Sequence, residues 1–206
     1  MTKWMQIFLL VTMSLISNSF SAESLVTDIF LKRHSGKSYD PARSVSIEQI
    51  HALIEVARWT PSSHNDQPWN FIICERNLTP EAYLKAFSSL KPETQQKWAI
   101  DAPLLIVVVA RSKELGKKKI NPWYEYDTGA AATCMALQAA DLGLMAHQVG
   151  GFNKEIISRE FQMPEDCHPL TVMVVGYELI AQQPIERDRR PIESNFFLGE
   201  WGVGFQ

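Results

Sequence analysis

Four short segments of the chain concentrate residues that could do chemistry outside regular secondary structure. The first, residues 32–37, reads Lys-Arg-His-Ser-Gly-Lys, and its cations and hydroxyl group either clamp a phosphate or cap the end of a helix. The last, residues 187–191, reads Arg-Asp-Arg-Arg-Pro and is by itself explained as a solvated run of charge. Phosphate binding is the chemistry that the first segment could do, and helix capping is the alternative explanation of the same residues.

The other two segments offer hydrogen-bond donors to a polar or planar ligand. Residues 60–69 form a polar loop that carries Pro61 and Pro68, and this loop either knits its own turns or presents donors to a ligand. Its Ser, His and Asp are chain neighbours and no GxSxG motif follows a strand, which disfavours nucleophilic hydrolysis. In residues 149–153, Gly150 and Gly151 either form a simple turn or let backbone amides approach a planar ligand. Their spacing is not the Rossmann GxGxxG.

Regular elements between these segments must position them. Ser46, with Gln49 three residues later, predicts a capping box and a helix. The β-branched run 104–110 is typical of a strand buried on both faces and so predicts the centre of the sheet. The Ala-rich stretch 128–142 predicts a helix that is buried nearly all round. Further helices are predicted over 24–34, from Pro80 to about 90 and over 153–161, and further strands over 69–74, 145–149 and 170–176.

Composition and charge narrow the class of protein. The 206 residues are 46% hydrophobic and 21% charged, which is ordinary globular usage. A net charge of −3 gives no general positive field, so nucleic acid is not expected as a partner. The three cysteines imply no disulfide framework, and no metal-ligand spacing occurs. With no linker or repeat, we expect one α+β layered domain with a long C-terminal tail.

The N-terminal segment carries the pattern of a secretory signal. Residues 7–16 are apolar and uncharged, but ten residues are too few to span a bilayer. They are typical of a signal-peptide core, and Ser19-Phe20-Ser21 satisfies the small-x-small rule for cleavage. We therefore expect residues 1–21 to be a signal peptide, residues 22–206 to be the folded domain, and the protein to be exported. The alternative is a cytoplasmic chain, for which Met13 is a possible later start.

Taken together and in order, these segments resemble the FMN-dependent nitroreductase family in its shorter form, from about Leu25 to Pro191. The resemblance rests on Arg-x-Ser-x-Lys, the loop Pro-Ser-Ser-x-Asn-x-Gln-Pro-Trp, Gln-Gln-x-Trp before Ala-Pro, the Gly-Gly pair and Arg-x-Pro. At the first Gln of Gln-Gln-x-Trp, Gln95, the family often has Asn. The residues that the resemblance assigns to FMN are Arg33, His34, Ser35, Lys37, Pro61, Ser62, Ser63, Asn65, Gln67, Gln96, Val149, Gly150, Gly151, Arg187 and Arg189.

The resemblance also implies a role for each group of residues. Arg33 and Arg189 would hold the 5′-phosphate, and Lys37 would stabilise negative charge near N1 and O2 of the reduced flavin. Gln96 would pair with the pyrimidine edge of the flavin. The amides of residues 150–151 would approach N5 and O4. The loop 61–69 would contact the flavin of the partner subunit.

The family implies a mostly antiparallel sheet flanked by helices, and a homodimer in which the C-terminal tail embraces the partner. The expected reaction passes hydride from NAD(P)H through FMN to a nitroaromatic, quinone or similar acceptor, with no obligatory protein acid or base. Trp123, Tyr124 and Tyr126 either line the open flavin face or belong to the core. The alternatives are an FMN-binding protein that stores or senses flavin without turnover, and a flavin-fragmenting relative that uses O2.

Overall fold

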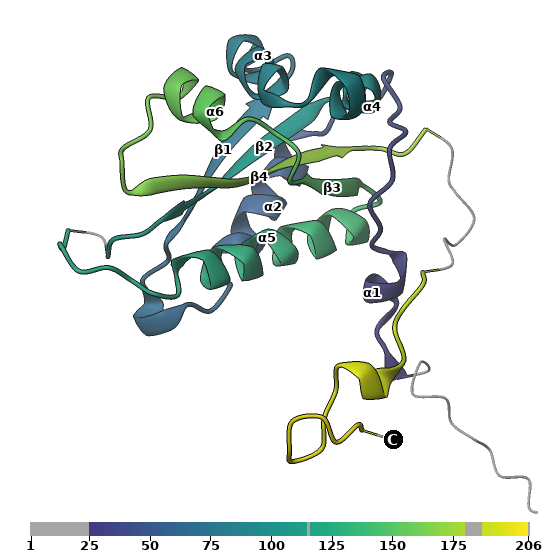
Figure 1. Cartoon of the computed structure of the whole chain (residues 1–206). Helices are drawn as coiled ribbons and strands as arrows, with labels where there is room; N and C mark the ends of the chain where they lie inside the picture. The colour runs from purple at the N-terminus through teal and green to yellow at the C-terminus, as the bar shows by residue number, and fades with distance from the viewer. Residues whose placement is uncertain (1–24, 115, 180–186, 206) are drawn as a thin grey trace, which may run out of the picture.

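A computed structural model describes residues 25–114, 116–179 and 187–205, and it contains one four-stranded sheet (Figure 1). Its strands lie in the order β1-β2-β4-β3, and every neighbouring pair is antiparallel. The predicted antiparallel α+β architecture is therefore confirmed. The strands are β1 (Trp69–Glu75), β2 (Leu104–Arg111), β3 (Met145–Val149) and β4 (Cys167–Gly176).

β2 is an inner strand of the sheet, next to the other inner strand β4, which agrees with the central position that its unbroken apolar run predicts. Successive side chains of a strand point to opposite faces. Leu105 and Val107 belong to one hydrophobic core, and Leu104 and Ile106 belong to another. Because both faces of β2 are covered, apolar residues are needed at every position rather than at alternate ones.

Helices cover the two faces of the sheet in separate layers (Figure 1). The longest, α5, packs under the sheet together with α2, and their buried residues share the second core. On the other face, α3 and α6 pack on each other and on the sheet. The helices are α1 (Asp28–Lys32), α2 (Ile47–Arg58), α3 (Pro80–Ser89), α4 (Lys97–Ala99), α5 (Tyr124–Asp141) and α6 (Lys154–Glu160).

Two predicted helices differ from those in the structure. The helix predicted over 24–34 is the single turn α1, which has no buried residue. The helix α5 begins at Tyr124, four residues before its predicted start, and the prediction that it is buried nearly all round is wrong. One face packs on the sheet, while Gly129 and Thr133 are exposed and Leu137 is half-buried. Alanine fits both a packed and an open helix face, so the Ala-rich composition did not distinguish them.

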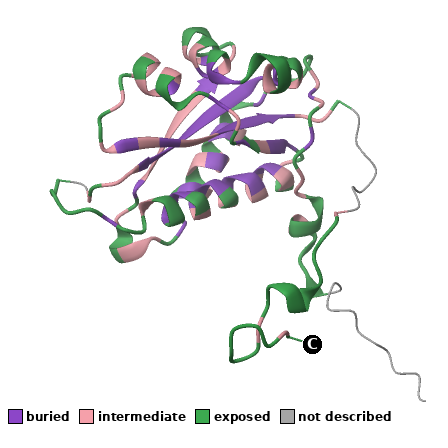
Figure 2. Ribbon diagram, viewed as in Figure 1, coloured by how far each residue is buried: buried purple, intermediate pink, exposed green. Residues whose placement is uncertain are grey.

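The segment that carries α1 and the C-terminal tail lie together beside the main body (Figure 1). Both are largely exposed (Figure 2) and carry large apolar side chains in the open; Phe30 is 52% exposed and Trp201 is 92% exposed. The apolar segment 7–16 and residues 1–21 as a whole lie outside the described residues. Among the residues that are described, no helix has the length and apolar character needed to cross a membrane.

The capping box of α2 is present as predicted and gives a test of local stability. The amide of Gln49 donates to Oγ of Ser46 at 3.2 Å, and the amide of Ser46 donates to Oε1 of Gln49 at 3.0 Å. We expect Ser46→Ala to lower the free energy of unfolding by about 1 kcal/mol in urea denaturation. The control is Ser88→Ala at an exposed position of α3, expected within about 0.5 kcal/mol of wild type. Equal losses in both variants would contradict a stabilising capping box.

Candidate functional site

Three arginines from distant parts of the chain converge at the end of α1. Arg33 immediately follows α1, whereas Arg187 and Arg189 belong to the tail. Burial lowers the pKa of Arg33 below its ordinary value, and the charges of Arg187 and Arg189 lower it further. Like charges brought together repel, so this arrangement is stabilised when an anion binds. The two segments taken singly do not predict this convergence, which the resemblance to the family implied for Arg33 and Arg189.

Arg187 has a different place in this cluster from the one predicted. Its guanidinium donates to the carbonyl oxygens of Phe30 at 3.0 Å and Leu31 at 2.7 Å, and also to that of Arg33. These bonds join the tail to the C-terminal end of α1, where carbonyl groups have no helical partner. Arg187 therefore positions Arg189 near Arg33, and its own guanidinium is engaged by the backbone rather than free for a ligand.

The segment from Arg33 to Lys37 is held against β3 and the end of β4. The side chain of His34 contacts Oε1 of Glu178 at 3.2 Å, and Nδ1 of His147 lies 2.9 Å from the carbonyl oxygen of Gly36. A Cβ atom at Gly36 would lie 2.3 Å from Sδ of Met145, so any larger residue here would force the buried Met145 side chain or the segment to shift. Ser35 accepts a hydrogen bond from Arg33 at 3.3 Å and is exposed.

A cavity of about 360 Å³ adjoins this segment and brings Lys37 together with the glycine pair. Gly151 packs against a side chain, because a Cβ atom there would lie 2.7 Å from Nε2 of Gln95. Gly150 instead has open space around it. A second cavity of about 230 Å³ includes Arg33, His34 and Glu178. The residues lining the first cavity are Lys37, Thr94, Gln95, Trp98, His147, Gln148, Val149, Gly150 and Gly151.

The structure places Gln95 on this cavity, in place of the predicted Gln96. Nε2 of Gln96 donates to the carbonyl oxygens of Leu90 at 2.9 Å and Phe87 at 3.3 Å, so its amide satisfies the end of α3. The cause is the wide turn over residues Pro92–Gln96, in which the amide of Gln96 bonds to the carbonyl of Lys91 five residues earlier. This turn directs Gln95 rather than its neighbour toward the glycine pair.

The loop 61–69 is compact and strained. His64, Asn65 and Gln67 all have φ between 49° and 56°, in the left-handed region that costs energy for side chains other than glycine. Oγ of Ser62 accepts from the amide of Gln67 at 3.0 Å, and Nε2 of Gln67 donates to the carbonyl of Asn65 at 3.2 Å. The loop therefore does knit its own turns, at the cost of strain that is typical of binding segments.

Contacts with the start of α5 fix this loop in place. The amide of Ser63 donates to Oδ2 of buried Asp127 at 3.0 Å, and Nδ2 of Asn121 donates to Oδ2 of Asp66 at 2.7 Å. Trp123 lines a small cavity next to the loop and is 55% exposed, and Tyr126 is 75% exposed. These two aromatic residues are therefore not core residues.

The predicted site residues form two groups at opposite ends of α5. The loop is tied to Asp127 in the first turn of α5, whereas the cavity of Arg33 includes Ala140 in its last turn. Thirteen residues of helix separate Asp127 from Ala140, which corresponds to about 20 Å. The cations and the glycine pair therefore lie together, and Pro61, Ser62, Ser63, Asn65 and Gln67 lie apart from them in the same chain.

Sequence reasoning did not find several residues of these two groups. His147 stands between Met145 and Val149, both of which belong to the core on that face of the sheet. The sequence did contain a signal for His147, because it is a polar residue on a strand face that is otherwise apolar. Asp127 is buried at 4% exposure in the first turn of α5, and a helix predicted to start at 128 concealed it.

Comparison with protein families matches residues 30–177 to the nitroreductase family, and the chain belongs to that family. The family predicted from the sequence motifs is therefore confirmed. A Methanothermobacter thermautotrophicus protein named as a candidate NADH dehydrogenase/NAD(P)H nitroreductase is 30% identical over 169 residues, covering 79% of this chain and 81% of the relative. The oxygen-insensitive NAD(P)H nitroreductase of Salmonella typhimurium is 20% identical over 82% of this chain and 97% of the relative.

Solved structures agree with this assignment. A crystal structure described as an oxidoreductase containing FMN superposes with a TM-score of 0.77 and 27% identity, over 85% of this chain and 92% of that chain. The predicted nitroreductase-like fold is therefore confirmed.

The arginine cluster gives a direct test of the anion site. We expect Arg33→Ala to weaken FMN binding at least tenfold, because a charge-assisted hydrogen bond of about 1.5–3 kcal/mol is lost. The dissociation constant is measured by quenching of flavin fluorescence. Arg58→Ala, which removes an exposed cation paired with Glu55 on α2, is the control and should bind FMN like wild type. Unchanged affinity in Arg33→Ala would refute the assignment of this cluster to the phosphate.

Proposed function

We propose that this chain is an FMN-dependent oxidoreductase of the nitroreductase type that uses NAD(P)H. The observation that carries the proposal is the convergence of Arg33, Arg187 and Arg189 beside the cavity of Lys37 and the glycine pair. FMN has a charged phosphate at one end and a planar, hydrogen-bonding ring at the other. The arginine cluster suits the phosphate, and the cavity of Lys37 and the glycine pair suits the ring. The FMN named in a related structure and the NAD(P)H named in relatives support the same function.

The residues of the chain would bind and orient the flavin. Arg33 and Arg189 would hold the phosphate, with Arg187 securing the tail. Lys37 would place a positive charge at the ring, which favours the reduced state because that state carries more negative charge. Bound FMN would supply the chemistry of hydride transfer between the donor and the acceptor. The protein then needs only to hold the donor over the ring and to admit the acceptor afterwards.

We further propose that the working form is a homodimer. Two chains related by a two-fold axis, with their α5 helices antiparallel, would bring the loop 61–69 of one chain to the arginine end of the other. This arrangement would unite the two groups of site residues that α5 separates within one chain. It would also give Trp123 and Tyr126, which stand in the open beside the loop, a place near the flavin of the other chain.

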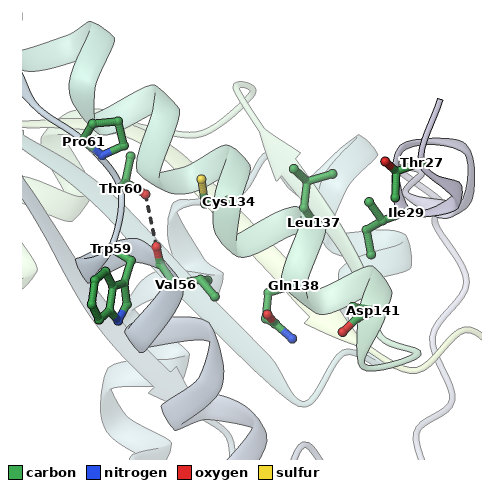
Figure 3. A pocket seen from close by; sticks show the side chains of 10 residues that line it. All are labelled: Thr27, Ile29, Val56, Trp59, Thr60, Pro61, Cys134, Leu137, Gln138 and Asp141. Atoms are coloured by element: carbon green, nitrogen blue, oxygen red, sulfur yellow. Dashed lines mark hydrogen bonds between the residues drawn. The ribbon is translucent and has the colours of Figure 1, made fainter. Parts of the chain in front are cut away.

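An exposed groove supports the same arrangement. It has a volume of about 550 Å³ and runs along α5 from Pro61 of the loop to Ile29 of α1 (Figure 3). Its walls include Leu137 and Trp59, which is 81% exposed. An open apolar surface of this kind is typical of an interaction site. Since the groove connects the two half-sites, a second copy of the chain is the occupant that suits it, and the apolar tail would add to that interface.

The dimer can be tested through the groove. We expect Leu137→Glu to shift the protein toward monomers at micromolar concentration in analytical ultracentrifugation, because it places a charge on an apolar surface that the partner would cover. FMN retention should fall in parallel, because the partner's loop would be lost. Leu84→Glu on α3, where the wild-type leucine is 64% exposed on the other side of the sheet, should stay dimeric. A wild-type chain that sediments as a monomer with full FMN would refute the dimer.

The electron donor can be tested by anaerobic stopped-flow reduction of the purified yellow protein. We expect bleaching of the flavin absorbance with NADH or NADPH, followed by reoxidation with a quinone or a nitroaromatic compound. A quinol is the third electron donor to be tested. The expected signal peptide over residues 1–21 would carry the protein out of the cytoplasm, and NAD(P)H is not expected outside the cytoplasm. Flavin that no donor reduces would contradict the oxidoreductase proposal and favour a non-catalytic FMN-binding protein.

A further inference from the structure

Glu178 places an acidic side chain in the cavity of the arginine cluster. This second cavity is lined by Arg33 and His34 as well as by Glu178, whose side chain is 13% exposed. A carboxylate repels the anion that the arginines suit, and burial makes an unpaired charge costly. The anion site therefore needs a partner for Glu178 that cancels its charge.

The backbone determines where Glu178 lies. Glu178 lies just after β4, and its backbone pairs with that of Tyr39 in an antiparallel bridge. Two hydrogen bonds, of 3.2 Å and 2.9 Å, join residues 38–40 to residues 177–179. Oε1 of Glu178 lies 3.0 Å from the position that a Cβ atom would take on Gly36. The carboxylate therefore faces the segment that carries Arg33.

Both ring nitrogens of His34 face hydrogen-bond acceptors. Nε2 lies 3.2 Å from Oε1 of Glu178, and Nδ1 lies 3.0 Å from the carbonyl oxygen of Lys32. A carbonyl oxygen and an ionised carboxylate only accept, whereas a neutral imidazole has a single N–H group. Both bonds therefore form together only when the pair of His34 and Glu178 holds one extra proton, as imidazolium with carboxylate or as neutral imidazole with carboxylic acid.

This extra proton sets both the charge and the anchoring of the pair. While the proton is present, the pair has no net charge and the ring is bonded at both nitrogens. When the proton leaves, the pair becomes negative, and one of the two bonds of the ring is lost because the ring retains a single donor. Histidine is the side chain that ordinarily changes charge between about pH 5 and pH 8, so both properties depend on pH.

The other ionisable groups around the pair do not produce the same change. Burial raises the pKa of Tyr39, and the charge of Glu178 raises it further, so this hydroxyl group stays neutral. Burial lowers the pKa of His147, which lies against Gly36, so this ring loses its proton at a lower pH than an ordinary histidine. The described residues of α5 and β3 that line the cavity are uncharged. The remaining groups are cations that stay charged throughout this range, namely Lys32, Arg33, Lys37, Arg187 and Arg189.

We propose that Glu178 is a positioning residue of the anion site, which holds the Arg33 segment through a proton shared with His34 and so makes FMN binding tighter at low pH. The inference rests on the FMN-binding function proposed above. With the proton, His34 ties the segment to the chain just after β4. Without it, one anchor is lost and an uncancelled carboxylate faces the phosphate. Glu178 acts through His34 and is not itself a contact of the flavin.

The test is the pH profile of FMN affinity. Dissociation constants are measured by quenching of flavin fluorescence on the full chain, after removal of bound flavin and at one protein concentration. We expect the wild-type dissociation constant to rise about fivefold between about pH 6 and about pH 8.5, because a hydrogen bond and the charge balance are lost. A phosphate monoester gains negative charge above about pH 6, so a purely cationic site would bind FMN more tightly instead.

Glu178→Gln is the matched variant, because its amide donates to Nε2 of a neutral ring while Nδ1 still donates to Lys32. This variant needs no extra proton to form both bonds, so it should bind FMN like wild type near pH 6 and about fivefold more tightly than wild type near pH 8.5. Glu81→Gln, at an exposed position of α3, should follow the wild-type profile. Melting temperatures report on the fold of both variants.

The outcomes separate the inference from the function on which it rests. Wild-type affinity that stays constant or increases as the pH rises would overturn the inference. So would a ratio between Glu178→Gln and wild type that is the same at both ends of the pH range, because Glu178 would then act only as a charge or as a structural residue. Wild type that binds no FMN at any pH would instead refute the proposed function.

Discussion

The hydrogen bonds that Arg187 donates to the end of α1 are the interaction on which the arginine cluster depends. Without them, nothing in the described residues ties the tail to Arg33, and the mutual repulsion of three guanidinium groups would separate the two segments. The carbonyl groups of one short helical turn therefore offset repulsion that a bound phosphate would remove. These bonds give α1 a structural role although none of its residues is buried.

Elements defined by local patterns were predictable from the sequence. The strand over 145–149 and the capping box at Ser46 are as predicted, because alternation and capping depend on residues close in the chain. The burial of α5 was not predictable, since alanine is compatible with either side of a helix. The orientations of Gln95 and Gln96 depend on a five-residue turn that no sequence pattern signalled.

The candidate site was also predictable only in part. Motifs indicated the candidate residues as one set, and the structure brings some of them, Arg33, Lys37 and the glycine pair, to one end of the sheet. The roles of single residues were harder to predict, because they depend on where a side chain is already engaged. Arg187 and Gln96 have the right residue types for a flavin, yet the backbone takes up their donors.

The length of α5 has one consequence for the protein in solution. If each flavin needs the arginine end of one subunit and the strained loop of another, cofactor affinity and subunit association are thermodynamically linked. Flavin would then strengthen the dimer by as much as dimerisation strengthens flavin binding. Dilution would release cofactor even without any change in the residues that contact it. Newly made chains would acquire full affinity for flavin only as they reach the concentration at which they pair.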